Sequence, residues 1–168
     1  MPFTDLLRVT VFATAAAATA LGAVAAIGAG READALTIYV GASWWLVAFG
    51  LGLYLGRPAR TADGVRDLLS GARTATSLPP EPPARIAAGR LWPIGAVALA
   101  AGAVGAFLPP VAAIAAGYAL LVALEMRSRE AAVLGIEQRD GVKFYVVPTS
   151  ALRPIRLVRT PGLRSEAT

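Results

Sequence analysis

The sequence predicts an all-α membrane protein: a four-transmembrane-helix bundle made of two antiparallel hairpins, with a small C-terminal cytoplasmic β-hairpin. Of the 168 residues, 56% are hydrophobic and the mean hydropathy is +0.59, against roughly 45 to 50% apolar residues in soluble domains. Residues 36–56 form a run of 21 residues without charge. As a helix this run is about 31 Å long, which matches a hydrocarbon core of about 30 Å.

The absence of two residue types from the sequence excludes several kinds of catalytic and metal site. The sequence has no cysteine and no histidine, which excludes disulfides, thiolate chemistry and zinc sites built from the usual ligands. It shows no glycine-rich phosphate loop, no carboxylate pair beside a nucleophile and no metal-ligand spacing. We therefore assign no catalytic residue, no cofactor and no metal site, and the sequence favours a non-enzymatic protein.

The basic residues predict the orientation of the chain. All of them except Arg31 lie in the N-terminal head, in a linker at 57–90 or in the tail from residue 125. Cytoplasmic segments of membrane proteins carry an excess of arginine and lysine, so both termini and the linker are predicted to be cytoplasmic. The single lysine, Lys143, and the abundant alanine and glycine are typical of a high-GC genome. A bacterial plasma membrane is the expected location.

The first predicted span covers residues 9–30, which are uncharged and rich in alanine. A cleaved signal peptide is the alternative, because small residues follow an apolar stretch. The head is barely positive, however, and the apolar region exceeds the usual 7 to 15 residues. We therefore expect a retained helix, joined by the short connection 31–35 to the second span as an antiparallel hairpin.

The second predicted span is 36–56. Tyr39 and Tyr54 lie near its two ends, where aromatic rings prefer the interface between membrane and water. Trp44 and Trp45 lie deeper than this aromatic belt. We expect them to fill space against an alanine-rich neighbouring helix, with contact to a partner or a lipid tail as the alternative.

The linker 57–90 is predicted to hold one short helix and one stiff spacer. Thr61 is a candidate N-cap for an amphipathic helix that ends near residue 72 and lies on the membrane surface. The segment 77–85 contains clustered prolines, which remove backbone donors and favour extended polyproline geometry. A proline-rich docking motif is the alternative for this spacer.

The third and fourth spans are predicted at about 91–108 and 110–126. Pro93 is placed in the first turn of the third span, where a missing amide costs nothing. The fourth apolar run is short before Glu125. It reaches spanning length if the helix begins near Pro109 and continues into the aqueous phase.

Residues 1–132 are thus predicted to form the transmembrane domain, and residues 133–168 a cytoplasmic unit with a basic tail. Asp140 and Gly141 are flanked by short alternating segments, and Asp-Gly is a strong hairpin signal. We expect a hairpin over 134–147 that places Ile136 opposite Tyr145 and docks on the end of the bundle. The side chains expected to cover it are Leu134, Ile136, Tyr145, Ile155 and Leu157.

One candidate contact surface is a stripe of small residues on the second span, Ala48, Gly52 and Gly56. Small residues every fourth position let helix backbones approach closely, which drives association in lipid. We expect this stripe to pack within the chain. Dimerisation through the same stripe is the alternative.

A second candidate is the charged cluster beside the fourth span, in which Glu125, Arg127 and Arg129 are candidate lipid head-group contacts. Arginine suits bidentate contact with phosphate. The interpretation that we favour for this cluster is a solvated helix end with internal ion pairs, with the lipid head-group contact as the functional alternative. The tail lacks the stacked aromatic residues of a nucleic-acid platform, so anionic lipid is the expected partner and nucleic acid is not.

These observations favour an accessory or scaffolding subunit that contacts anionic lipid and either a protein partner or further copies of itself. No predicted span carries an ionisable residue, and such residues at depth usually mark ion or proton paths. One alternative is an oligomeric permease or channel component for an uncharged solute. A second is a membrane enzyme that acts on a lipid head group.

Overall fold

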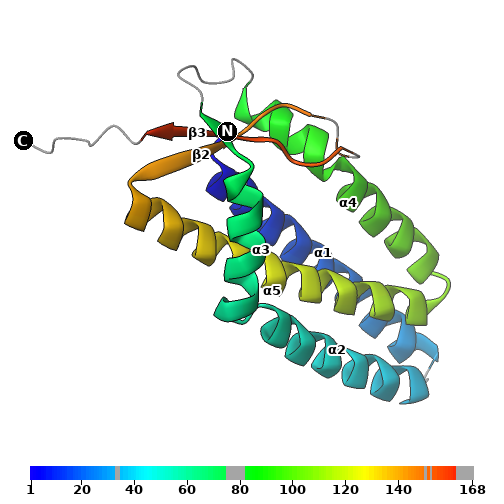
Figure 1. The fold of residues 1–168 in the computed structure, drawn as a ribbon. Helices are drawn as coiled ribbons and strands as arrows, with labels where there is room; N and C mark the ends of the chain where they lie inside the picture. Colours follow the sequence, from blue (N-terminus) through cyan, green and yellow to red (C-terminus); the bar gives the residue numbers. More distant parts are fainter. Residues whose placement is uncertain (33–34, 75–81, 150, 152, 162–168) are drawn as a thin grey trace, which may run out of the picture.

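Four long helices make up most of the chain. The computed structural model describes residues 1–32, 35–74, 82–149, 151 and 153–161, and their arrangement is shown in Figure 1. Within these residues, four helices are long and apolar enough to cross a membrane: α1 (Phe3–Glu32), α2 (Ala35–Leu55), α4 (Pro83–Gly105) and α5 (Pro109–Asp140). This confirms the predicted helices of membrane-spanning length and composition.

The helices extend beyond most of the predicted spans. α2 matches the predicted 36–56 to within one residue at each end, whereas α1 begins at Phe3 rather than at residue 9. α5 begins at Pro109 and continues past the end of the predicted span near residue 126, both as expected, and it extends as far as Asp140. Hydropathy marks only the part of a helix that suits lipid, while backbone hydrogen bonding continues into the polar turns at either end.

The third long helix is the one whose predicted bounds were least accurate. α4 begins at Pro83 and ends at Gly105, rather than covering 91–108, and Pro93 lies inside it. Pro93 therefore has no N–H to donate to the carbonyl of Gly89, four residues earlier. Pro82 forms the N-cap in an extended conformation. Most of the predicted proline spacer, residues 77–81, lies outside the described residues.

The long helices are arranged around a central pair. α1 and α5 pack against each other along much of their length, α2 packs mainly on α5, and α4 packs on α1 and α5. In Figure 1, α2 (cyan) and α4 (green) lie on opposite sides of this pair. α2 has much less contact with its sequence neighbour α1 than with α5. The main tertiary partner of α2 is therefore α5, the last of the four long helices.

Small residues allow the close approach of the central helices. A buried cluster joins α1 to α5 and contains Leu21 and Ala25 from the first helix and Ala112, Ala113 and Ala116 from the last. In lipid, apolar burial gives little drive for association, so contact between closely packed backbones has to supply it. The alanine-rich sequence of α5 thus allows α1, α2 and α4 all to pack against this one helix.

A short amphipathic helix, α3 (Pro58–Ser70), follows α2 and packs across α5 (Figure 1). Val65 and Leu69 are buried, as expected for an amphipathic helix, whereas Leu68, expected on the same apolar face, is exposed. The predicted N-cap is wrong. Arg57 occupies that position, and the Thr61 hydroxyl lies inside the helix and donates to the Arg57 carbonyl at 3.2 Å.

A small sheet lies at the end of the molecule where α1 begins. Among the described residues its strands are β1 (Arg73–Thr74), β2 (Val142–Val146) and β3 (Leu157–Pro161), in the order β1-β3-β2. β2 is antiparallel to β3, and β1 is parallel to β3. The outer edge of β2 is covered by the N-terminus, because the Val146 N–H donates to the Met1 carbonyl at 3.0 Å.

The predicted hairpin over 134–147 is wrong in its first strand. Leu134 and Ile136 belong to the last turns of α5, and Gly141 is the C-cap of that helix with a φ of 63°. A left-handed glycine suits both a helix end and a hairpin turn. Strand β2 pairs instead with β3, and β3 also pairs with β1 from the predicted linker. The sheet therefore includes the predicted second strand but is not a C-terminal hairpin.

The buried face of β2 also differs from the prediction. Phe144 and Val146 are buried, and Tyr145 between them is half-exposed. Phe144 and Val146 belong to a cluster that we call the cap core, which joins the start of α1, α3, the start of α4, the end of α5 and the sheet. Its buried members are Met1, Phe3, Leu6, Leu7, Val65, Leu69, Ile86, Val133, Phe144, Val146 and Leu157.

Candidate functional site

The three charged residues predicted to contact a lipid head group do not converge on one point. Glu125 accepts a hydrogen bond from the Arg129 guanidinium at 2.6 Å, one turn further along α5. Arg127 is exposed and lies about 200° around the helix from Glu125. The structure therefore brings Glu125 and Arg129 together as an ion pair and places Arg127 on another face.

A further ion pair links the two central helices beside this cluster. The Arg8 Nε of α1 donates to Glu130 Oε1 of α5 at 3.1 Å, and the Glu130 side chain is only 14% exposed. The sequence does not predict this pair, since residues 122 positions apart give no local signal. The pair links the N-terminal head to α5 close to the cap core.

The predicted stripe of small residues lies on the face of α2 that packs against α5. Ala48 is fully buried. A Cβ added at Gly52 lies 2.8 Å from Leu124 Cδ1, and one added at Gly56 collides with the Ser128 side chain. Contact between two copies of the chain through this stripe therefore requires α5 to move away from it.

The two adjacent tryptophans of α2 are also directed at α5. The Trp44 indole N–H donates to the Ile114 carbonyl at 3.1 Å, and that of Trp45 donates to the Ala113 carbonyl at 2.8 Å. An indole N–H in an apolar setting needs an acceptor, and a carbonyl with two lone pairs can accept a second bond. Trp44 and Trp45 therefore hold α2 against α5 by hydrogen bonds to backbone carbonyls as well as by filling space.

Gly117 makes the approach of Trp44 possible. A Cβ added at Gly117 collides with the Trp44 indole ring, and the same ring packs against Tyr118 with a centroid distance of 5.2 Å. This position was not predicted, because a stripe of small residues was assigned on the second span and none on the fourth. The spacing of Ala113 and Gly117, four residues apart, is the signal that could have found it.

Arg90 lies on α4 one turn before Pro93, and the sequence analysis placed it in the linker. Its guanidinium donates to the Arg153 carbonyl at 2.8 Å and to the Thr149 hydroxyl. Both acceptors are neutral oxygens in the segment between β2 and β3. Among the described residues no carboxylate forms an ion pair with Arg90 within 4.0 Å.

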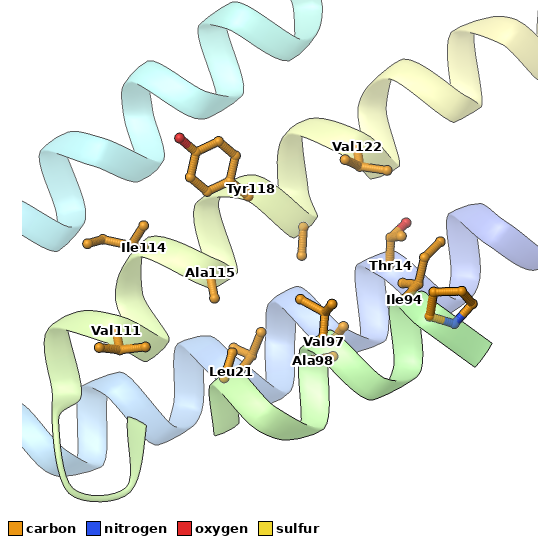
Figure 2. Close-up of a pocket in the computed structure, with 14 residues that line it drawn as sticks. Thr14, Leu21, Ile94, Val97, Ala98, Val111, Ile114, Ala115, Tyr118 and Val122 are labelled. Carbon is orange, nitrogen blue, oxygen red and sulfur yellow. The ribbon is translucent and has the colours of Figure 1, made fainter. Parts of the chain in front are cut away.

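An apolar groove of about 600 Å³ lies between α1, α4 and α5. Figure 2 shows Thr14 and Leu21 on the α1 side, Ile94, Val97 and Ala98 on the α4 side, and residues from Val111 to Val122 on the α5 side. The Thr14 hydroxyl already donates to the Thr10 carbonyl at 2.8 Å. The groove therefore suits a hydrocarbon ligand and offers few polar groups.

Within the described residues, no group of three or more acidic side chains is arranged to hold a metal ion. Comparison of the chain with protein-family models, with curated proteins and with solved structures found no match.

Proposed function

We propose that the protein is a non-enzymatic accessory or scaffolding subunit of a bacterial plasma membrane, with a basic cytoplasmic face that contacts anionic lipid and a protein partner. The four long helices form a transmembrane bundle in this proposal. The end of the molecule built around the cap core, namely the start of α1, α3, the start of α4, the end of α5 and the sheet, is called the cap and lies in the cytoplasm with both termini. The division into residues 1–132 and 133–168 stays a prediction.

The apolar outer surface of the helices supports the membrane-embedded part of this proposal. α2 exposes large apolar side chains along its length, among them Leu36, Val40, Leu46 and Leu53. Such a surface is stable in lipid but is a liability in water.

One observation carries the proposed partner contact: exposed basic side chains gather around the cap. They come from the head, α3, the end of α5 and the sheet, whereas Arg31 lies at the opposite end of α1. Arg8, Arg66 and Arg139 each form an ion pair with a carboxylate, so the surface is mixed in sign with an excess of positive charge. Such an excess attracts acidic partners and anionic lipids. The exposed basic residues include Arg8, Arg57, Arg66, Arg127, Arg139, Lys143, Arg153 and Arg156.

The orientation predicts the outcome of reporter fusions. A reporter that is active only in the cytoplasm should be active when fused after residue 168. The same reporter should be inactive when inserted at residues 33–34, between α1 and α2. An inactive fusion at residue 168 combined with an active insertion at 33–34 contradicts the proposed orientation.

The accessory role predicts a protein partner that depends on the cap. We expect the full-length chain, purified repeatedly in mild detergent, to bring down the same partner in fixed proportion. The exposed-residue variant Arg66→Glu/Arg127→Glu should lose this partner, because the charge of the cap is reversed at two positions. Arg31→Glu at the opposite end of α1 is the matched control and should retain it. Recovery of the wild-type chain alone and monomeric in every preparation contradicts the accessory role.

A further inference from the structure

The groove between α1, α4 and α5 leads toward charged residues at the cap end of the molecule. On α4, Pro93 and Ile94 line the groove, and Arg90 lies three and four residues before them. Residues with this spacing share one face of a helix, and a helical side chain points back toward the N-terminus. The Arg90 guanidinium is thus directed from the end of the groove toward the cap.

The α5 wall of the groove ends in a second charged pair. Val122 lines the groove, and Glu125 and Arg129 follow it at spacings of three and seven residues on the same face of the helix. Because Arg129 is already paired with Glu125 at 2.6 Å, its charge is compensated. Arg90, in contrast, forms no ion pair within 4.0 Å among the described residues, so its charge is uncompensated there.

Arg90 is oriented for an anion. Its two hydrogen bonds go to the neutral oxygens of Arg153 and Thr149, which hold the guanidinium without cancelling its charge. Nε is buried and has no hydrogen-bond partner in the described part of the chain. Each terminal nitrogen carries a second hydrogen besides the one it already donates, and hydrogen bonds from a guanidinium to a phosphate are charge-assisted.

The size of the groove favours a hydrocarbon chain over a partner helix. An α-helix with its side chains is about 10 Å wide, so a piece as long as the α5 wall from Val111 to Val122 occupies roughly 1,300 Å³. The groove volume of about 600 Å³ is less than half of this. Since lipid tails are as apolar as the groove walls, a tail alone gives little selectivity, and the charge of the head group has to supply it.

We propose that the groove and Arg90 together form a binding site for one anionic phospholipid. One acyl chain lies between α1, α4 and α5, and the phosphate contacts the Arg90 guanidinium. This inference rests on the membrane location in the proposed function, and it assigns the lipid contact to Arg90 instead of to Glu125, Arg127 and Arg129.

The test compares lipid retention by the full-length protein after delipidation in detergent. Phosphatidylglycerol and phosphatidylcholine with identical chains are added, and bound lipid is counted by native mass spectrometry. The wild-type chain should retain phosphatidylglycerol about tenfold better, which is the scale of one charge-assisted hydrogen bond. Arg90→Gln should abolish this preference. Arg85→Gln, on the same helix but exposed, should keep it.

A second variant separates lipid binding from the structural role of Arg90. Ala98→Leu narrows the groove without changing any charge, and we expect it to lower retention of both lipids. Inorganic phosphate alone should not displace phosphatidylglycerol, because the acyl chain anchors the lipid. Equal retention of the two lipids by wild type, an unchanged preference in Arg90→Gln, or a second protein chain seated in the groove overturns the inference. Partner recovery in mild detergent is scored separately, so a failed lipid site and a failed accessory role give different results.

Discussion

Replacing Phe144 with alanine should destabilise the cap by about 3 to 5 kcal/mol, the usual cost of removing a buried phenyl ring. Phe144 is 3% exposed and packs in the cap core beside Val146. Its backbone N–H donates to the Glu137 carboxylate at 3.1 Å, so the ring is positioned at the junction of β2 and α5. The loss should appear as a lower midpoint of thermal or denaturant unfolding in detergent.

Two neighbouring substitutions make the Phe144 result specific. Lys143→Ala changes an exposed side chain on the same strand, and we expect an effect within about 0.5 kcal/mol. Tyr145→Ala tests the alternation of the strand, because the sequence-based hairpin placed Tyr145 on the covered face. A larger loss for Tyr145→Ala than for Phe144→Ala contradicts the observed burial.

Replacing Gly117 with alanine should weaken the packing of α2 on α5 and lower the stability of the protein. The added methyl group has no space beside the Trp44 indole, and the ring is held by its hydrogen bond to the Ile114 carbonyl. Overpacking of a tight contact costs about 1 to 3 kcal/mol. We expect a lower thermal unfolding midpoint together with a shift in tryptophan fluorescence as Trp44 loses its acceptor.

Gly135→Ala is the matched control for this substitution. Gly135 lies on the same helix α5, and a Cβ added there meets no atom within 4 Å. Any general effect of alanine on the helix is thus common to both variants. If Gly117→Ala and Gly135→Ala unfold at the same midpoint with the same fluorescence, the close contact between Trp44 and α5 is not formed.

The sequence determined the features that depend on a continuous run of residues. The uncharged segment 36–56 specified α2 almost to the residue, because solubility in lipid is decided by length and charge along one helix. The small residues Ala48 and Gly52 showed which face of α2 permits close packing, since period and side-chain size can be read locally. The stripe of small residues did not indicate which helix would pack against it.

Only the tertiary structure decided that Asp140 and Gly141 end a helix instead of forming a hairpin turn. The glycine φ of 63° is compatible with a helix C-cap and with a hairpin turn, so the dipeptide alone leaves both open. Val133 selects between them: as part of α5 it is fully buried in the cap core, against residues from the first turns of the chain. That burial joins segments more than a hundred residues apart, and no local pattern contains it.

The candidate binding residues follow the same division. Glu125 and Arg129 were found from their spacing along one helix, which also forms their ion pair. Arg90 and Gly117 gain their roles from other elements, Arg90 from the segment that holds Thr149 and Gly117 from the indole of Trp44. A side chain's hydrogen-bond partners and the space around a glycine are properties of packed surfaces, so they were decided only when α2, α4 and α5 came together.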